Sequence, residues 1–366
     1  MCPATESTAR AAAWIPWPDS GKKPRMRREA VPYLACPNCG ATSELALRSV
    51  EREEREHVME GKLGCAAGGC VFEIRRGVPI LIPGQVDGAM TETAARFAEE
   101  WTRWTELRDY YERQFLGWVA PVSRADFEGK VVFEGGCGKG RHTDLVARFG
   151  ARAIVAVDLG ESAFVAFENT RELPNAHIVM ADLTHPPVRS VFDLAFSVGV
   201  VHHLPDPSAG ARSVASVLRD GGRLVLWVYG RENNEWIVKY VDPIRHALTS
   251  RVPWRPLKAL SSIPAGVIWA AIRLLHGPTA PGARLGRHLP YAEYFASMRG
   301  FPFDELQLIV FDQLVTPVAH YLSRAEVAAW FEGPEFRDVE LRWHNQMSWT
   351  ATAIRATPGS AASAVA

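Results

Sequence analysis

A cluster of glycines directly after a short apolar run constrains the fold of this chain more than any other feature. Four glycines fall within positions 135–140, between an apolar run that ends at Glu134 and sequence compatible with a helix. Glycines let the backbone turn sharply and approach a ligand closely, and a helix that begins beside them points free N–H groups into the same space. A second acid, Asp158, ends the next apolar run, where a carboxylate can accept hydrogen bonds from a ribose diol. The pattern predicts a loop that binds a nucleoside.

Alternating apolar runs and helical stretches over residues 129–230 predict repeated βαβ units. The apolar runs barely alternate with polar residues, which is typical of strands buried on both faces. Two later runs, Phe336–Trp343 and Ser348–Arg355, are close enough to form an antiparallel hairpin at the sheet edge. The five strands expected before them are Lys130–Glu134, Ala153–Asp158, His177–Ala181, Phe192–Ser197 and Arg223–Tyr229.

The order of motifs in this region resembles that of class I methyltransferases, across roughly residues 95–355. The resemblance implies an α/β fold with a doubly wound, seven-stranded, mostly parallel Rossmann-like sheet whose last strand is antiparallel. The segments that carry it are Glu134–Gly140, Ala153–Asp158, Met180–Leu183, Phe192–Asp206 and Leu218–Leu224.

The same resemblance implies S-adenosylmethionine as the cofactor. It implies that Asp158 binds the ribose hydroxyls and that Asp182 contacts the adenine amino group. Glu134 stands where Asp is commoner in this family, but the longer side chain still offers a carboxylate. The full set of expected cofactor-binding residues is Glu134, Gly135, Gly136, Gly138, Gly140, Asp158, Leu159, Asp182, Leu183 and Ser197.

Two adjacent histidines follow the fourth expected strand, at the edge of the sheet where ligands bind in open α/β folds. An unperturbed pKa near 6.5 suits a histidine to proton transfer, so His202 and His203 are candidates for a general base. The alternative is that they hydrogen-bond the loop and only shape the pocket. His142, His320 and Tyr321 are candidates for lining the acceptor site, with a packed loop as the alternative for the last two.

Four cysteines form two tight pairs, Cys36 with Cys39 and Cys65 with Cys70. Such pairs can close a tetrahedral zinc site, and a site made of four thiolates is structural rather than catalytic. The segment Val71–Leu81 resembles the end of the small zinc-binding activator domain that accompanies tRNA and release-factor methyltransferases. We therefore expect a structural zinc ion in a zinc-ribbon-like domain, with reduced free thiols as the alternative.

The chain is expected to divide into several parts, one of which interrupts the methyltransferase domain. Within that insertion, the segment 251–276 is apolar with flanking Arg and Lys. Its apolar run from Ile263 to Leu275 is shorter than a bilayer span needs. We therefore expect a lid over the site, with weak membrane or lipophilic-substrate contact as the alternative. The expected parts are a disordered arm (1–30), a zinc-ribbon-like domain (31–84), a helical lead-in (90–128), a methyltransferase domain (129–356) with a helical insertion (231–330), and a disordered tail (357–366).

Composition and one missing motif narrow the expected acceptor. Lys plus Arg equals Asp plus Glu, at 41 each, so no net field attracts nucleic acid. The run Ser197–Val200 differs from the Asn/Asp-Pro-Pro-Tyr/Phe motif of enzymes that methylate planar nitrogens. We therefore expect a methyltransferase with a small-molecule acceptor, O-methylation being favoured over C- or N-methylation, and no strong nucleic-acid signal. The alternatives are a tRNA wobble-uridine methyltransferase, which the zinc domain and the Ser197–His203 run resemble, and a non-catalytic cofactor-binding module.

The N-terminal sequence bears on where the protein is found in the cell. The first thirty residues contain no apolar run of signal-peptide length, which favours a cytoplasmic protein. The sequence leaves the oligomeric state open.

Overall fold

The computed structural model describes residues 26–356 apart from 55–56, 85, 248, 250–251, 277–279 and 317. The expected tail and most of the expected arm lie outside these residues. The arm was expected to extend to residue 30, but residues 26–30 belong to strand β1 (Met26–Arg27) and to the 3-10 helix η1 (Arg28–Tyr33). The ordered N-terminal domain therefore begins earlier than the sequence indicated.

The central sheet has the seven strands and the mostly parallel arrangement expected from the sequence. Seven strands follow one another across it in the order β12-β13-β11-β10-β7-β8-β9. The five strands that come first along the chain, β7 to β11, are parallel to one another. Strand β13 is antiparallel to both of its neighbours, β11 and β12. The predicted fold class and the C-terminal hairpin are confirmed. The strands are β7 (Val131–Gly135), β8 (Ala153–Asp158), β9 (Ala176–Ala181), β10 (Phe192–Val198), β11 (Leu218–Tyr229), β12 (Phe336–His344) and β13 (Ser348–Arg355).

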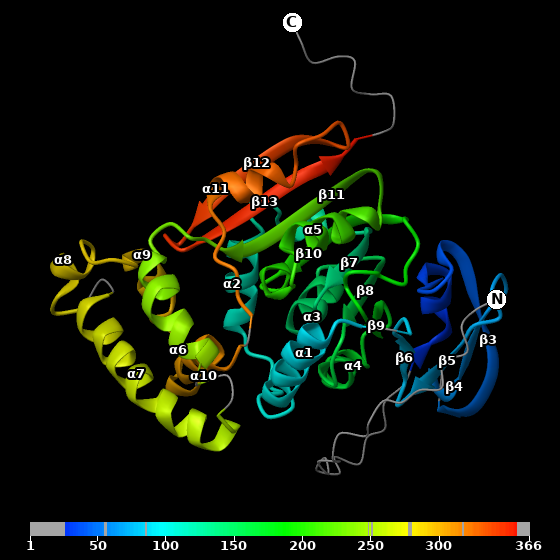
Figure 1. Ribbon diagram of the computed structural model, residues 1–366, viewed down its shortest axis with the longest axis horizontal. Helices are drawn as coiled ribbons and strands as arrows, with labels where there is room; N and C mark the ends of the chain where they lie inside the picture. Colours follow the sequence, from blue (N-terminus) through cyan, green and yellow to red (C-terminus); the bar gives the residue numbers. More distant parts are fainter. Residues whose placement is uncertain are drawn as a thin grey trace, which may run out of the picture.

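Helices cover both faces of this sheet (Figure 1). On one face Phe115 and Val146, from α2 (Tyr110–Val119) and α3 (Arg141–Arg148), pack on buried strand residues such as Phe196. On the other face Val214 of α5 (Pro207–Ser216) joins a second buried cluster with strand residues. Burial on both faces explains why the strands read as continuous apolar runs. Two more helices, α1 (Gly88–Trp101) and α4 (Ser162–Thr170), lie beside the glycine loop.

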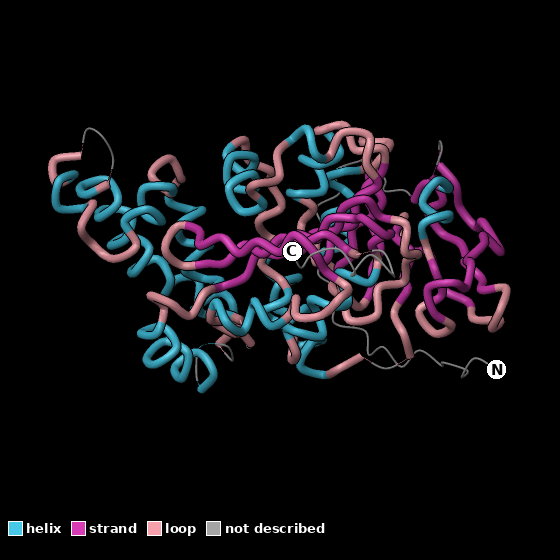
Figure 2. The backbone as a smooth tube through the Cα atoms, turned by 90° about the horizontal axis from the view of Figure 1, so that it is seen from above, coloured by secondary structure: helices cyan, strands magenta, loops and turns pink. Residues whose placement is uncertain are grey.

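The N-terminal domain extends the same sheet instead of standing apart from it. Its last strand, β6, pairs in parallel with β9 through Ile80 and Met180. Figure 2 shows its strands at one end of the molecule, opposite the helical insertion. The strands of the domain are β2 (Ala35–Cys36), β3 (Gly40–Glu54), β4 (His57–Cys65), β5 (Val71–Arg75) and β6 (Val78–Leu81).

The insertion leaves β11 and returns beside it. Its two ends meet in a bridge between Gly230 and Leu322. The helical part at the left of Figure 1 lies far from the N-terminal domain. Its helices are η4 (Ile237–Val241), α6 (Asp242–Ala247), α7 (Trp254–Leu275), α8 (Ala283–Gly286), α9 (Ala292–Ser297) and α10 (Phe303–Val315), followed by α11 (Arg324–Ala329).

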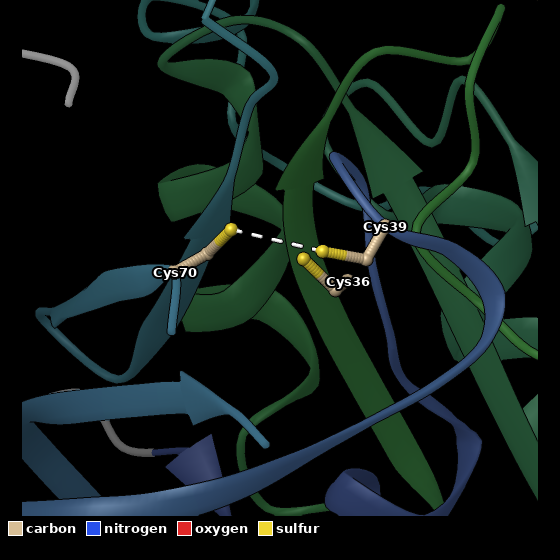
Figure 3. Close-up of side chains that lie close together, drawn as sticks. All are labelled: Cys36, Cys39 and Cys70. Carbon is tan, nitrogen blue, oxygen red and sulfur yellow. Dashed lines mark hydrogen bonds between the residues drawn. The ribbon is translucent and has the colours of Figure 1, made fainter. Parts of the chain in front are cut away.

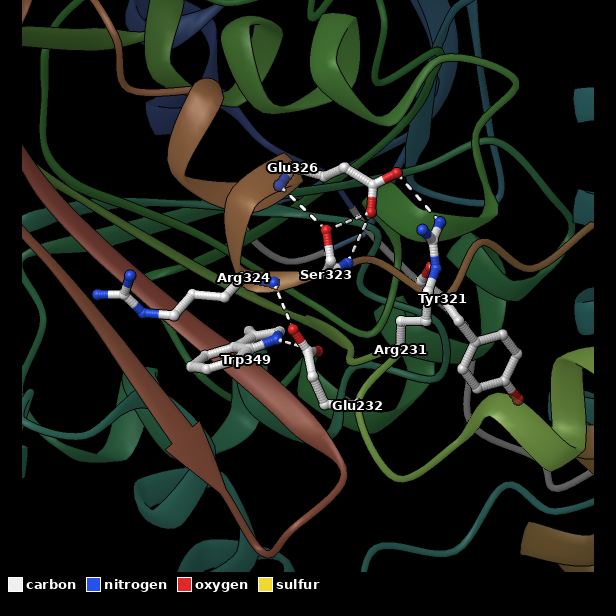
Figure 4. Close-up of polar contacts among 7 residues, drawn as sticks. All are labelled: Arg231, Glu232, Tyr321, Ser323, Arg324, Glu326 and Trp349. Carbon is white, nitrogen blue, oxygen red and sulfur yellow. Dashed lines mark hydrogen bonds and ion pairs between the residues drawn. The ribbon is translucent and has the colours of Figure 1, made fainter.

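Polar contacts fix the two ends of the insertion to each other (Figure 4). Ser323 and Glu326 form a capping box at the start of α11, and Glu326 also pairs with Arg231 at 3.0 Å. Glu232 accepts hydrogen bonds from the backbone N–H of Arg324 and from the indole of Trp349, which lies on β13. The insertion is therefore anchored to the sheet at the point where it begins.

Candidate functional site

The glycine loop adopts backbone conformations that require glycine. Gly136, Gly138 and Gly140 have φ of +81°, +52° and +79°, a region that costs other residues about 1–2 kcal/mol. A Cβ atom on Gly136 would lie 2.3 Å from the side chain of Val200, and one on Gly140 would lie 2.9 Å from the Cα of Ala166. The loop is therefore shaped by close packing as well as by its turns.

Asp158 holds this loop in position. Its Oδ2 accepts a hydrogen bond from the N–H of Gly138 at 2.8 Å. Its Oδ1 accepts from the hydroxyl of Ser162 at 2.6 Å and from the N–H of Gly160 at 3.1 Å. Burial raises the pKa of Asp158, whereas these hydrogen bonds lower it. Each carboxylate oxygen has two acceptor sites, so Oδ2 can still accept from a ligand hydroxyl.

A large cavity opens above the loop, lined by α1, the ends of β8, β10 and β11, and α10 of the insertion. Five of the expected cofactor-binding residues line it: Gly136, Gly138, Asp158, Leu159 and Leu183.

The other expected cofactor-binding residues lie behind the cavity wall. Ser197 donates to the carbonyl of Gly135 at 2.8 Å, and Asp182 accepts from the backbone N–H and the hydroxyl of Thr184. Gly140 begins α3 and does not line the cavity. Direct contact of these residues with a cofactor stays a prediction.

Glu134 is fully buried beneath the glycine loop. Its Oε2 accepts from the hydroxyl of Thr143 at 2.5 Å, and its Oε1 lies 3.3 Å from Nδ1 of His142. Burial raises the pKa of Glu134 to about 8 and lowers that of His142. Both side chains are therefore mostly neutral at pH 7. His142 reaches the cavity, as expected for a lining residue, but Glu134 does not.

The two adjacent histidines have different surroundings. His203 lines the cavity, and its Nδ1 lies 2.6 Å from the carbonyl of Val318. A proton on Nδ1 would leave Nε2 as an acceptor. Burial lowers the pKa of His203 to about 4. His202 is completely buried, with its ring 4.1 Å from that of Tyr229, and does not line the cavity.

His320 and Tyr321 support the wall from outside. The N–H of His320 donates to the carbonyl of His202 at 2.8 Å. The hydroxyl of Tyr321 donates to Oε1 of Gln313 at 2.8 Å, and Gln313 in turn lines the cavity. Neither predicted residue is itself among the lining side chains.

Two cations in the cavity wall are absent from the sequence-based set of site residues. Lys139 donates to the carbonyl of Trp104 and to the hydroxyl of Tyr111, at 2.9 and 3.0 Å. Burial lowers the pKa of Lys139 to about 8. The guanidinium of Arg141 lies 5.3 Å from the ring of Trp118 and a similar distance from that of Tyr111. Their position in and directly after the glycine loop could have identified them as site residues. The aromatic rings around them come from other segments of the chain.

Three carboxyl groups complete this polar wall. Asp312 and Glu305 line the cavity from α10, and the hydroxyl of Tyr111 donates to Glu305 at 3.2 Å. Glu100, 1% exposed on α1, lies against Asp312. Burial raises the pKa of Asp312 to about 6 and raises that of Glu100 further above its ordinary value. Oδ1 of Asp312 has no hydrogen-bond partner among the described residues, so it remains available for a proton.

The cysteines of the N-terminal domain converge (Figure 3). The sulfur atoms of Cys36, Cys39 and Cys70 lie within 4.8 Å of one another, and that of Cys39 is 3.9 Å from that of Cys70. A zinc tetrahedron with Zn–S bonds of about 2.3 Å needs sulfurs about 3.8 Å apart. Cys65 is adjacent, since its N–H donates to the carbonyl of Cys70. A Cβ on Gly68 would lie 2.4 Å from the Cys39 sulfur, so the turn needs glycine there. Three of the four expected ligand sulfurs are therefore grouped, and the four-cysteine zinc site stays a prediction.

Comparison with known proteins agrees with the fold and the loop. The family described as "Methyltransferase domain" matches residues 133–226. A tRNA U34 carboxymethyltransferase from Idiomarina loihiensis is 31% identical over 119 residues, which are 31% of this chain and 37% of that protein. The protein of the same name from Mannheimia succiniciproducens is 29% identical over 149 residues, 40% of this chain and 44% of that protein. The chain therefore matches less than half the length of these relatives.

Solved structures of similar proteins superpose only loosely. A DhpI–SAH complex has a TM-score of 0.43 and 14% identity, covering 74% of this chain and 99% of that one. A SAM-dependent methyltransferase from Aquifex aeolicus has a TM-score of 0.39 and 12% identity, covering 70% and 98%. The family assignment rests on the sequence match.

The relatives correct two of the expectations drawn from the sequence. A small-molecule acceptor with O-methylation favoured was expected, together with no strong nucleic-acid signal. Both expectations are wrong, because the curated relatives are named for a tRNA position. The expectation of no nucleic-acid signal rested on the balanced charge of the whole chain. That balance says nothing about the shape of the acceptor pocket. The matched family, the strand order and the glycine loop with its acid show that this chain carries a class I S-adenosylmethionine-dependent methyltransferase domain.

Proposed function

We propose that the protein transfers the methyl group of S-adenosylmethionine to a uridine base of tRNA, breaking the sulfur–carbon bond and leaving S-adenosylhomocysteine. The observation that carries the proposal is the match, across the glycine loop and the sheet, to relatives named tRNA U34 carboxymethyltransferase. The acceptor region of the cavity supports it through its shape and its aromatic lining.

The cofactor would bind against the glycine loop. Gly136 and Gly138 let its backbone approach, Asp158 would accept from the ribose hydroxyls, and Leu159 and Leu183 would contact the adenine. When bound, the cofactor supplies an alkyl group on a positively charged sulfur, which is already activated for displacement. The protein then has to align the acceptor and exclude water, and orientation can supply about 7–11 kcal/mol of such a barrier.

The acceptor base would enter the same cavity from its mouth. Rings of Phe97, Trp101, Trp118 and Tyr229 line the wall, and unstacked RNA bases are commonly held on aromatic side chains. An enzyme that modifies a nucleobase has to take that base out of its stack, which a deep cavity permits. Arg141, among these rings, would donate to the base or to its phosphate.

Asp312 and His203 are the candidates for accepting the proton that the acceptor loses, because Lys139, with a pKa of about 8, is mostly protonated at pH 7 and donates to Trp104 and Tyr111. Asp312, with a pKa of about 6, is the stronger base, since the pKa of His203 is about 4. We therefore propose Asp312 as the proton acceptor, with Glu100 sharing the proton, and His203 as a residue that orients the acceptor. His202 would position His203, against which its ring lies at 4.2 Å.

We also propose that Cys36, Cys39, Cys65 and Cys70 hold a structural zinc ion. The metal would fix the turn at Gly68 and thereby the N-terminal domain, whose β6 extends the sheet beside β9. No step of the transfer needs it.

The experiment compares tRNA nucleosides from the parent strain and from a strain lacking this gene, by mass spectrometry. The proposal expects one modified uridine to disappear in the deletion strain, to return with the parent gene, and to stay absent with Gly136→Ala. Identical nucleosides in both strains would refute a tRNA acceptor. Cofactor binding without any transferred group would identify a non-catalytic module.

A further inference from the structure

The outward face of α7 is apolar along almost its whole length. Leu260, Ile263, Val267 and Leu274 are 51%, 69%, 67% and 57% exposed. Their spacing of three, four and seven residues aligns them along one side of the helix. Large aliphatic side chains with this exposure form a continuous stripe instead of scattered surface residues.

The opposite face of α7 is already used. Leu257 packs with Phe311 and Val315 of α10, and Ile272 packs with Leu306 and Phe301. The helix therefore has two apolar faces, of which only one is covered by the described part of the chain. It lies at the outer edge of the insertion in Figure 1.

Charges border the stripe without interrupting it. The only charged residues in α7 are Arg255, Lys258 and Arg273, and the helix contains no acid. At 3.6 Å, the guanidinium of Arg273 stacks on the ring of Trp269, which holds this charge beside the apolar face. Successive residues turn by about 100° around the helix, so both arginines fall on the same edge of the stripe.

The part of the insertion around α7 is basic although the whole chain is neutral and the full insertion, residues 231–330, contains eleven Lys and Arg and eight Asp and Glu. Residues 236–300 contain nine Lys and Arg but only two Asp and Glu, whereas the chain has 41 of each kind. Arg284 and Arg287, on and just after α8, are exposed and lie beyond the end of α7. The overall balance that argued against anionic partners therefore hides a positive region.

We propose that this face of α7 docks on an anionic phospholipid surface, with the helix lying in the interface. An exposed apolar stripe bordered by cations and free of acids is the pattern of interfacial helices. Cations alone would also suit RNA phosphates, but RNA offers nothing for four exposed aliphatic side chains. A protein partner would not account for the absence of acids.

The helix lies on the membrane instead of crossing it. By length and composition it is the one described helix that could span a bilayer, with 22 residues and a mean hydropathy of 1.3 over an 18-residue window. Crossing would nevertheless strip Leu257 and Ile272 from α10, which packs on them. The inference is independent of the acceptor, because none of the stripe residues lines the cavity.

The test is flotation of the full chain with phospholipid vesicles. The vesicles contain phosphatidylcholine alone or an equimolar mixture with anionic phosphatidylglycerol. The double variant Ile263→Glu/Val267→Glu removes the stripe. Val71→Glu is the matched control, because Val71 is 50% exposed on β5 in the N-terminal domain. Calorimetric binding of S-adenosylmethionine reports whether each variant is folded.

The inference expects binding to the anionic vesicles that weakens with salt, falls by about tenfold or more in the double variant, and is unchanged in Val71→Glu. Unchanged vesicle binding in the double variant would overturn it. So would self-association of the parent chain that the double variant abolishes, because a second copy would then cover the face. Loss of tRNA affinity but not vesicle binding in Arg255→Glu/Arg273→Glu would assign these charges to RNA and overturn the proposal.

Discussion

The carboxylate of Asp158 accepts a hydrogen bond from the N–H of Gly138 at 2.8 Å. The acid expected to bind the ribose is therefore also the group that fixes the glycine loop. A second oxygen bonded to Ser162 holds the carboxylate in place. The site is thus ordered before a cofactor enters, which reduces the entropic cost of binding.

Replacing Asp158 by Ala should weaken the affinity for S-adenosylhomocysteine by about 1–3 kcal/mol, because an N–H and the ribose hydroxyls both lose an acceptor. Titration calorimetry measures the effect. Asp206→Ala is the control, since Asp206 caps α5 through the N–H of Ala209 and does not line the cavity. Equal affinities for the Asp158 variant and the parent would refute the assignment of the ribose site.

Gly136→Ala should abolish cofactor binding, because the new Cβ would lie 2.3 Å from Val200 at a φ of +81°. Gly129→Ala is the matched control: its φ is +68°, but no atom lies within 4 Å of the new Cβ. It should lose only about 1–2 kcal/mol of stability and bind cofactor normally. Thermal unfolding and calorimetry separate the two effects, and normal binding by Gly136→Ala would disprove the packing argument.

The transfer rate should rise with pH through about 6, the pKa of Asp312, because the proton acceptor has to be ionised. Glu100, Glu305, Lys139 and Arg141 surround this carboxyl and set its titration together. In the profile of rate against pH, Asp312→Asn should remove the rise near pH 6, whereas His203→Gln should keep that rise. If the rise of the rate with pH were lost only in His203→Gln, the histidine would be the base, as the sequence first suggested.

Glu134 should make the fold less stable as pH rises. Its folded pKa of about 8 exceeds its ordinary value of 4.5, so the folded state holds a proton that the unfolded state releases between these values. Stability is therefore full below about pH 4.5 and declines up to about pH 8. Glu134→Gln keeps the hydrogen bond from Thr143 and should flatten this decline in unfolding midpoint. An unchanged slope would show that the carboxyl is ionised in the fold.

Protein purified without chelator should contain one zinc ion per chain, and Cys39→Ser should lose it. Cys137→Ser should retain it, because Cys137 lies in the glycine loop, away from the cysteine cluster. Removal of zinc should increase hydrogen exchange in β3–β5 more than in β7–β11. Absence of zinc from the parent protein would eliminate the metal site.

The sequence predicted the sheet well because its strands are buried on both faces and its loop needs glycine at fixed positions. It predicted the acceptor side poorly. Arg141, Glu100 and Asp312 come from α3, α1 and α10, and nothing in their local sequence indicates that they meet. The pairing of β6 with β9 is also a long-range contact without a local signal. The basic stretch 236–300 escaped notice because charge was considered over the whole chain.

The most direct measurement of the central claim is transfer of label from methyl-labelled S-adenosylmethionine to tRNA by the purified chain. The tRNA comes from the deletion strain and is digested to nucleosides for mass analysis. The account predicts a label on one uridine-derived nucleoside, absent with Gly136→Ala. Label that stays on the cofactor while calorimetry shows cofactor binding would contradict the proposed function.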